Sequence, residues 1–552
     1  MAAYADRARN FSFPYYPPEE AMVRTVPNVA LANVLSKQKT SLTSKRMLML
    51  YYCLFVATLC SCINGYDTSL MGSINSYPQY RTYFGFDLTK GTPTTGIVYA
   101  IYTIGNMVGS FAAGPASDFR GRRVGMLLGS LIGIFGSVIQ ASCRNLAGFM
   151  IGRFILGFGV AITATAGPAY VSEMAHPEFR GTMTAIYNTF WYFGAVPGTF
   201  IPYATSKIPS SMAWRIPLWL QLVFAGLVLI LCFFLPETPR WLIANNRHDA
   251  ALEVMAKYHG NGDRNSPIVL LEYGEMCQDI SRTGSDKRWW DYRELYNSRE
   301  VRYRSMLVIM MGSIGSNGLV TYYYPAMLRK AGISSNQQQL LYQGFQNVIS
   351  FAGAVAGAIF TDKWGRRPQM MVSTSLAAVL FAIIMALNAT NVDDVNVPNP
   401  VAKSGHVARA ELAMIYIFGF VYSCGWTPNQ AMYPVEVLRF ENRAKGMGMY
   451  NFWVNIAQFY NTFVTDIAFT HAGWKYYFLF IFWDTFEVAM MYFFFVETKK
   501  RTLEELTEIF RARRPVKTSL KQIEVVYRGN SVMEVDIKRN HESFVLRTTS
   551  PR

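Results

Sequence analysis

The stretches Asp118-Phe-Arg-Gly-Arg-Arg123 and Asp362-Lys-Trp-Gly-Arg-Arg367 are two copies of one acidic–basic signature. Each copy directly follows a long apolar run, and 244 residues separate the two copies. Because an internal repeat determines the architecture of the chain that contains it, this duplication predicts two structurally equivalent halves.

Two further signatures are duplicated in the same order. A glutamate precedes an arginine by seven residues in each half, and a Glu-Thr pair with basic residues closes each half. The residues are Glu173 and Arg180, Glu436 and Arg443, Glu237-Thr-Pro-Arg240 and Glu497-Thr-Lys-Lys500. Three charged signatures at corresponding positions predict a parallel repeat about an axis along the membrane normal, with a binding site between the halves.

Apolar runs of membrane length follow one another along almost the whole chain. Of its 552 residues, 51% are hydrophobic and 16% are charged, whereas a soluble domain carries about 25% charged residues. A membrane-spanning helix needs about 20 predominantly apolar residues. We predict twelve spans, at 47–72, 95–116, 124–143, 147–171, 183–204, 215–235, 305–328, 338–361, 369–390, 411–434, 446–470 and 474–496. The predicted fold class is an all-α membrane protein of two six-helix bundles.

These spans divide the chain into five parts. They are an N-terminal tail (1–46), a first bundle (47–235), a polar linker with short helices (236–304), a second bundle (305–496), and a C-terminal helix and tail (497–552). The last 35 or so residues are predicted to be disordered, because they are polar and charged. With the N-terminal tail inside, 10 basic residues fall in external loops and 41 on the inner side. The positive-inside rule therefore predicts that both termini are cytoplasmic.

Several classes of function are disfavoured by composition. The net charge is +16, but the basic residues cluster in alternate loops between apolar runs, so nucleic-acid binding is not expected. None of the seven cysteines forms a Cys-x-x-Cys pair, which argues against a zinc site or a disulfide framework. The six histidines are scattered, and no nucleophile–base spacing or phosphate-binding loop is present, so we expect neither an enzyme nor a cofactor or metal.

The duplicated signatures resemble the major facilitator superfamily and, within it, the sugar porter family. The resemblance covers about residues 46–511 and is carried also by PETPRW (236–241), GRFILGFGV (152–160) and VETKKRTLEEL (496–506). The stretches SNGLVTYYY (316–324) and YPVEVLRFENRAKGMG (433–448) are most similar to the fungal lactose and cellodextrin permease branch. The resemblance implies a monomeric plasma-membrane carrier that moves one small carbohydrate per cycle by alternating access.

Asp67 and Arg153 are charges inside predicted membrane helices, which makes them a functional hypothesis by default. At 1.5 Å per residue, Asp67 lies about 30 Å along an outward-running helix and Arg153 about 10 Å into an inward-running one, so both fall in the outer half. A carboxyl balanced between burial and a guanidinium is able to bind and release a proton. The pair matches the Asp and Arg that the resemblance implies for proton coupling. The alternative is a structural ion pair.

The charged signatures are predicted to form a cytoplasmic gate. In the resembled family, these charges link helix ends in the outward-facing carrier and separate when it opens inward. The gate set is Asp118, Arg122, Arg123, Glu173, Arg180, Glu237 and Arg240 in the first half, and Asp362, Arg366, Arg367, Glu436, Arg443 and Glu497 in the second. The alternative for an isolated arginine is that it only obeys the positive-inside rule.

A sugar needs amides, hydroxyls and an aromatic platform within an otherwise apolar cavity. The candidates inside predicted spans are Asn188, Trp191, Asn317, Tyr322, Tyr323, Gln343, Gln346, Asn347, Trp426, Asn429, Gln430, Asn455, Gln458 and Asn461. The alternative is interhelical hydrogen bonding, which also recruits Asn and Gln.

The sequence departs from the hexose-type sugar porters at three places. Those porters carry a Gln-Gln pair where this chain has Met311-Gly-Ser313, a Trp where it has Ala431, and Gln-Trp where it has Val454-Asn455. The departures argue against glucose-type recognition, and the smaller residues would leave room for a disaccharide.

Three functions remain open at this point. The first is a carbohydrate:proton symporter in the lipid bilayer, with a sugar and a proton as its partners. The second is a facilitative carrier of the same fold. The third is a transporter-like nutrient sensor without flux, which the short C-terminal tail disfavours.

Overall fold

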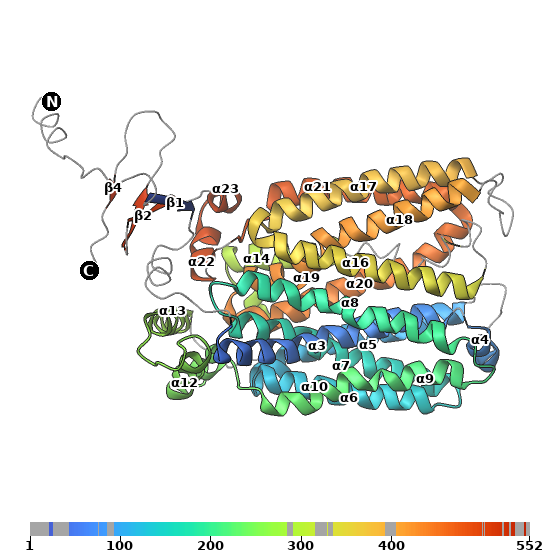
Figure 1. Cartoon of the computed structure of the whole chain (residues 1–552), viewed down its shortest axis with the longest axis horizontal. Coiled ribbons are helices and arrows are strands. Elements are labelled where there is room, and N and C mark those ends of the chain that lie inside the picture. Colours follow the sequence, from blue (N-terminus) through green and yellow to red (C-terminus); the bar gives the residue numbers. More distant parts are fainter. Residues whose placement is uncertain are drawn as a thin grey trace, which may run out of the picture.

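The computed structural model describes residues 21–25, 43–75, 77–85, 93–283, 291–314, 328, 335–391, 405–499, 501, 503–520, 524–528, 531–535 and 546–547. Figure 1 shows long, roughly parallel helices, with short helices and the chain ends gathered at one end. We call this end the GRR end, because it carries both Asp-x-x-Gly-Arg-Arg stretches. The other end carries the short helix α4 (Pro78–Phe84), and we call it the α4 end.

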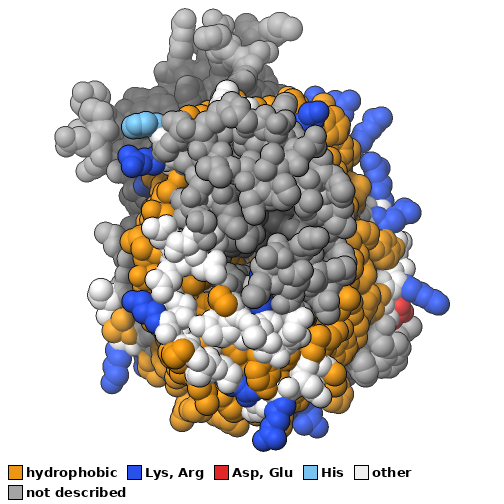
Figure 2. Space-filling model, turned by 90° about the vertical axis from the view of Figure 1, so that its right-hand side faces the viewer, with side chains coloured by type: hydrophobic (Ala, Val, Ile, Leu, Met, Phe, Trp, Pro, Cys, Tyr) orange, Lys and Arg blue, Asp and Glu red, His pale blue; other side chains and the backbone are white. Residues whose placement is uncertain are grey.

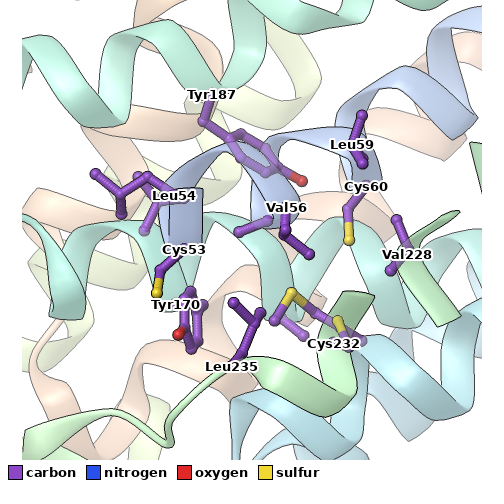
Figure 3. Close-up of a cluster of buried hydrophobic side chains, with 14 of the residues drawn as sticks. Cys53, Leu54, Val56, Leu59, Cys60, Tyr170, Tyr187, Val228, Cys232 and Leu235 are labelled. Atoms are coloured by element: carbon purple, nitrogen blue, oxygen red, sulfur yellow. The ribbon is translucent and has the colours of Figure 1, made fainter. Parts of the chain in front are cut away.

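The first half of the bundle consists of long helices with short connections. They are α3 (Lys45–Ile74), α5 (Pro93–Phe119), α6 (Arg122–Ser142), α7 (Leu146–Met174), α8 (Arg180–Thr205), α9 (Met212–Leu220) and α10 (Leu222–Leu231), the last continued by η1 (Cys232–Phe234). Its core forms where α3 packs on α7, α8 and α10. In Figure 3, Cys53, Leu59 and Cys60 of α3 lie close to Tyr170, Val228 and Cys232 from other helices.

The second half follows a linker of short helices. The linker contains α11 (Pro239–Ala244), α12 (His248–Tyr258), α13 (Pro267–Thr283) and η2 (Tyr292–Tyr296). The second half contains α14 (Arg299–Ile314), α16 (Asn336–Trp364), α17 (Arg366–Asn391), α18 (Gly405–Gly425), α19 (Thr427–Val437), α20 (Phe440–Ala472), η3 (Gly473–Tyr476) and α21 (Tyr477–Phe494), followed by α22 (Leu503–Arg511) and α23 (Pro515–Ser519). The halves meet where α5 packs on α20 and where α8 packs on α16 and α19.

The twelve predicted spans overlap these helices, with bounds that differ by one or two residues at some ends, and residues 315–327 lie outside the described part. Seven segments are long and apolar enough to cross a membrane: 45–74, 122–142, 146–174, 212–234, 336–364, 366–390 and 477–494. Helices α5, α8, α18 and α20 are absent from this set of described segments. Of these, α5, α8 and α20 pack between the halves, where protein rather than lipid surrounds their polar side chains.

The C-terminal tail forms strands where the sequence predicted disorder, and these strands pair with one strand of the N-terminal tail. β1 (Ala21–Thr25) pairs antiparallel with β2 (Glu524–Arg528), which pairs with β3 (Ser531–Val535) and then β4 (Leu546–Arg547). Gly529-Asn530 separates β2 from β3 with Arg528 opposite Ser531, the spacing of a two-residue hairpin. The valine-rich stretches beside this turn signal outweigh the polar composition of the tail.

Candidate functional site

The first half carries a network of buried charges at the GRR end. Gly121, at a φ of 100°, ends the turn before α6, and the Glu237 carboxylate accepts the backbone N–H groups of Arg122 at 2.8 Å and Arg123 at 3.3 Å. A carboxylate at a helix N-terminus satisfies free amides and favours the helix dipole. The Arg122 guanidinium pairs with Asp118 at 2.8 Å and with Glu173 at 3.2 Å.

The second half repeats this arrangement group for group. Gly365 has a φ of 97°, and Glu497 accepts the backbone N–H groups of Arg366 and Arg367, each at 3.1 Å. Arg366 pairs with Asp362 at 2.9 Å and with Glu436 at 2.8 Å. Arg123 and Arg367 also correspond, since each donates to a carbonyl of its own half, that of Phe233 or Tyr492. The repeat read from the sequence therefore extends to hydrogen-bond geometry.

Direct contacts between the halves break this symmetry. Arg443 crosses from α20 to Glu173 of α7 at 3.3 Å, and the Thr182 hydroxyl of α8 donates to Asp362 of α16 at 2.5 Å. Arg180, the sequence counterpart of Arg443, reaches Glu272 of α13 at 3.7 Å. Arg240 is buried and adds its charge beside Glu173. The predicted gate residues thus meet at one end of the bundle, and this end is closed.

A histidine–carboxylate pair ties the linker helices to this closed end. His259, after α12, lies 2.6 Å from Glu272 of α13, and its other ring nitrogen lies 3.1 Å from the Met174 carbonyl. Burial lowers the pKa of His259, but the Glu272 carboxylate has the larger effect, so the pKa of His259 is raised overall. Burial raises the pKa of Glu272, but the nearby His259 has the larger effect, so the pKa of Glu272 is lowered overall. Both shifts in pKa favour the charged form of each partner. Burial and then the nearby His259 lower the pKa of His176 to about 4.

Asp67 and Arg153 form a buried ion pair in the first half, as their predicted depths required. Arg153 Nη1 lies 2.6 Å from Asp67 Oδ1, and the Gln221 amide donates to the same oxygen at 3.0 Å. The guanidinium carbon also lies 4.5 Å from the ring centre of Tyr102. The second carboxylate oxygen, Oδ2, is buried and has no hydrogen-bond partner among the described residues. This oxygen is where a proton is accommodated without breaking either contact.

A cavity of about 220 Å³ lies between the halves. Its described lining combines amides and hydroxyls with an aromatic wall and holds no Asp, Glu, Lys, Arg or His. The lining residues are Cys60, Ser61, Asn64, Thr68, Ala164, Tyr187, Asn188, Trp191, Tyr192, Met311, Tyr422, Thr427, Gln430, Ala431, Met447, Tyr450, Asn451, Val454, Gln458 and Asn461. Figure 2 looks onto the α4 end, where hydrophobic side chains (orange) lie on the flanks, most Lys and Arg side chains (blue) lie around the edge, and uncharged side chains and backbone (white) lie nearer the middle.

Some of the predicted substrate residues line this cavity, namely Asn188, Trp191, Gln430, Gln458 and Asn461. Asn188 also joins the halves, because its amide donates to the Thr427 carbonyl at 2.7 Å and to Gln430 at 3.1 Å. Candidates not in the lining are Gln343, Gln346, Asn347, Trp426, Asn429 and Asn455. Asn317, Tyr322 and Tyr323 lie outside the described residues.

Three of the candidates away from the cavity form hydrogen bonds to neighbouring helices. The Trp426 indole donates to the Thr374 hydroxyl at 2.9 Å, and the Asn429 amide donates to Gln369 Oε1 of α17 at 3.4 Å. Asn347 donates across the halves to the Ala195 carbonyl at 3.4 Å. These contacts correspond to the interhelical alternative that the sequence left open.

The cavity also contains residues that sequence reasoning missed. They include Ser61, Asn64 and Thr68 of α3. Their spacing of three or four residues places them on one polar face of an otherwise apolar helix, and this spacing was a signal in the sequence that could have identified them. Three positions that depart from hexose-type porters, Met311, Ala431 and Val454, line it as well.

Comparisons with known proteins agree with this architecture. The family model described as "Sugar (and other) transporter" matches residues 53–510. The chain is 28% identical to high-affinity glucose transporter 1 of Candida albicans, over 83% of this chain and 85% of that protein. It is 26% identical to a quinate permease of Neurospora terricola, over 89% and 92%.

Among solved structures, the chain is similar to the proton:xylose symporter XylE bound to 6-bromo-6-deoxy-D-glucose. The TM-score is 0.70 at 19% identity, covering 84% of this chain and 99% of that one. The TM-score against the inward-open form of XylE from E. coli is 0.61, at 20% identity, with 83% and 99% covered. At these identities the likeness shows the fold alone, and it confirms the predicted fold class.

Proposed function

We propose, from the premise that this chain belongs to the sugar (and other) transporter family, that it is a carbohydrate:proton symporter working by alternating access. The observation that carries the proposal is a buried Asp67–Arg153 pair in the same half-bundle that supplies one wall of an uncharged, hydrogen-bonding cavity.

The cavity chemistry favours a neutral polyhydroxylated solute. Amides and hydroxyls such as Asn188, Gln430 and Thr427 suit sugar hydroxyls, and Trp191 offers an aromatic face to the ring. Quinate, by contrast, carries a carboxylate, and the described lining holds no basic side chain to receive it. We therefore propose a sugar rather than an organic acid as the substrate.

Proton coupling is supported by the surroundings of Asp67. A buried carboxylate is costly in a membrane, and Arg153 and Gln221 offset that cost through one oxygen only. Protonation of the other oxygen would weaken the attraction to Arg153 without requiring a new cavity. Such a carboxyl exchanges a proton as the surrounding helices rearrange.

The GRR-end network would act as the gate. We propose that residues 47–235 and 305–496 rock against each other, with 1–46, 236–304 and 497–552 on the cytoplasmic side of the plasma membrane. The pairs Arg443–Glu173 and Thr182–Asp362 would break when this end opens. We propose a monomer, because the cavity lies between the two halves of a single chain.

Uptake in a transporter-deficient cell tests the proposal. Labelled D-glucose, D-xylose, lactose and cellobiose are supplied with and without a pH gradient. We expect accumulation of at least one sugar that collapses with a protonophore, and we expect Asp67→Asn to abolish accumulation while sugar exchange persists. The control is Asp249→Asn, an exposed aspartate of α12.

Two results would contradict the symporter. Uptake without concentration above equilibrium would identify a facilitative carrier, with Asp67 and Arg153 structural. Binding without flux in proteoliposomes would identify a sensor.

A further inference from the structure

The ion pair and the cavity are separate features of the structure. Neither Asp67 nor Arg153 is among the described residues that line the cavity. Coupled transport needs a physical link that makes the affinity for one ligand depend on the other. A side chain that touches both features would provide this link.

Tyr102 of α5 is such a side chain. It is 4% exposed, and its ring lies under the Arg153 guanidinium at 4.5 Å. Its hydroxyl interacts with the Asp67 carboxyl and also donates to Asn64 Oδ1 at 3.4 Å. The Asn64 contact is longer than the usual 2.5–3.0 Å of an O–H···O hydrogen bond.

Asn64 carries this contact into the cavity wall. Its Oδ1 accepts from the Tyr102 hydroxyl, and both Asn64 and Thr68 line the cavity. The Thr68 hydroxyl donates to the Asn64 backbone carbonyl at 2.9 Å and lies 3.3 Å from Asn64 Oδ1. The opposite atom, Nδ2, donates to no described residue, so its N–H groups are available to a ligand hydroxyl.

We propose that Tyr102 is the positioning residue that links proton occupancy of Asp67 to sugar binding at Asn64; the inference rests on the proposed proton symport. Ionised Asp67 is the stronger acceptor and draws the Tyr102 hydroxyl away from Asn64. Protonated Asp67 is a weaker acceptor, so the hydroxyl turns to Asn64 Oδ1 and fixes the amide with Nδ2 toward the cavity. The sugar then binds more tightly to the protonated carrier, and by linkage the bound sugar retains the proton.

The groups facing Asp67 are few. They are Arg153 from α7, Tyr102 from α5 and Tyr66 on its own helix, with the neutral Gln221 from the junction of α9 and α10. In the proposed cycle the charge of Asp67 changes, while Tyr102 only redirects its hydroxyl.

The test is Tyr102→Phe, which keeps the ring against Arg153 and removes the hydroxyl. The dissociation constant of purified protein is measured at pH 5.5 and 7.5, with D-glucose or the panel sugar of highest uptake as probe. We expect wild type to bind the sugar more tightly at pH 5.5, so that the ratio of the dissociation constants at pH 7.5 and pH 5.5 lies within the roughly 5- to 150-fold range of allosteric couplings. In Tyr102→Phe, we expect this ratio to be close to one. The matched control is Tyr170→Phe, whose side chain is also buried but whose hydroxyl donates to the Pro236 carbonyl at 3.0 Å; it should keep the wild-type ratio.

A second variant keeps the test decisive if Tyr102→Phe does not fold. Asn64→Ala retains Tyr102 but removes the amide, and we expect weaker binding at both pH values together with a ratio close to one. A wild-type ratio retained in either variant overturns the role of Tyr102. A wild type without pH-dependent binding or gradient-driven uptake of any panel sugar overturns the symporter itself, so the two failures are distinguishable.

Discussion

At the scale of single residues, Glu173 joins the two halves of the bundle through ion pairs to both of them. It is 1% exposed and pairs with Arg122 of its own half, with Arg443 of the other, and with the Thr238 hydroxyl at 2.7 Å. Removing one member of a buried charge cluster leaves the others uncompensated, at a cost of about 3–5 kcal/mol. Loss of this carboxylate should therefore favour the state in which the halves separate.

We predict that Glu173→Gln opens the GRR end. The measurement is the maleimide reactivity of Thr182→Cys in purified protein, compared with the chain lacking that cysteine. We expect the reaction rate of this cysteine to rise about tenfold, which corresponds to a shift of about 1.4 kcal/mol in the equilibrium between the closed and open states. The control Glu253→Gln changes an exposed residue of α12 and should leave the rate unchanged. Unchanged reactivity in Glu173→Gln would remove it from the gate.

His176 gives a prediction on pH and stability. Its pKa is lowered to about 4, first by burial and then by His259, so the folded protein binds fewer protons than the unfolded chain between about pH 6.5 and 4. Stability therefore falls as the pH falls through this window. In detergent, His176→Gln should lose less Tm than wild type between pH 7.5 and 5, whereas the exposed His406→Gln should follow wild type. Parallel curves for both variants would contradict the assignment.

At the scale of helices, the start of α6 and of α17 depends on a glycine and a distant glutamate. A Cβ added at Gly121 would lie 2.4 Å from the carboxyl carbon of Glu237, and one added at Gly365 would lie 2.6 Å from Glu497 Oε2. Both glycines also have positive φ, which costs other residues about 1–3 kcal/mol. Each substitution would strain the backbone and displace the carboxylate that caps the helix.

We predict that Gly121→Ala and Gly365→Ala each lower Tm by a few degrees and reduce transport. Gly226→Ala in α10 is the matched control, because nothing lies within 4 Å of its added Cβ and its backbone is helical. Alanine favours a helix over glycine by about 1 kcal/mol, so the control should keep or raise Tm. Equal effects at all three positions would mean that the glutamate caps are unimportant.

At the scale of the whole molecule, the closed GRR end must open for transport if the halves rock. A Cβ at Gly114 of α5 would lie 3.3 Å from the Cα of Lys445 in α20. This approach is close enough for paired cysteines to form a disulfide after small adjustments.

We predict that oxidised Gly114→Cys/Lys445→Cys is locked closed. Uptake should fall to background and return when a reductant is added. Each single cysteine variant serves as a control, which also separates the loss of the Lys445–Glu294 ion pair from the cross-link. Full uptake by the oxidised double variant would rule out separation of α5 and α20 during the cycle.

The sequence by itself determined the class of protein, the membrane-length runs and the twofold repeat. These depend on local properties, namely the length of apolar runs and the charges at their ends. The same reasoning placed Asp67 and Arg153 at a common depth, because the rise per residue is fixed in a helix. Their contact at 2.6 Å follows from depth and from the packing of α3 on α7.

Only the tertiary structure decided which faces of the helices meet. A helix buried on all sides carries no amphipathic signal that fixes its rotation. Thus Asn188 and Gln430 line the cavity, whereas Asn429 and Trp426 donate to side chains of the neighbouring helix α17. The sequence also left undetermined which carboxylate each gate arginine pairs with, because side-chain pairing depends on neighbours distant in sequence. Arg443 pairs with Glu173, whereas its repeat counterpart Arg180 pairs with Glu272 of the linker.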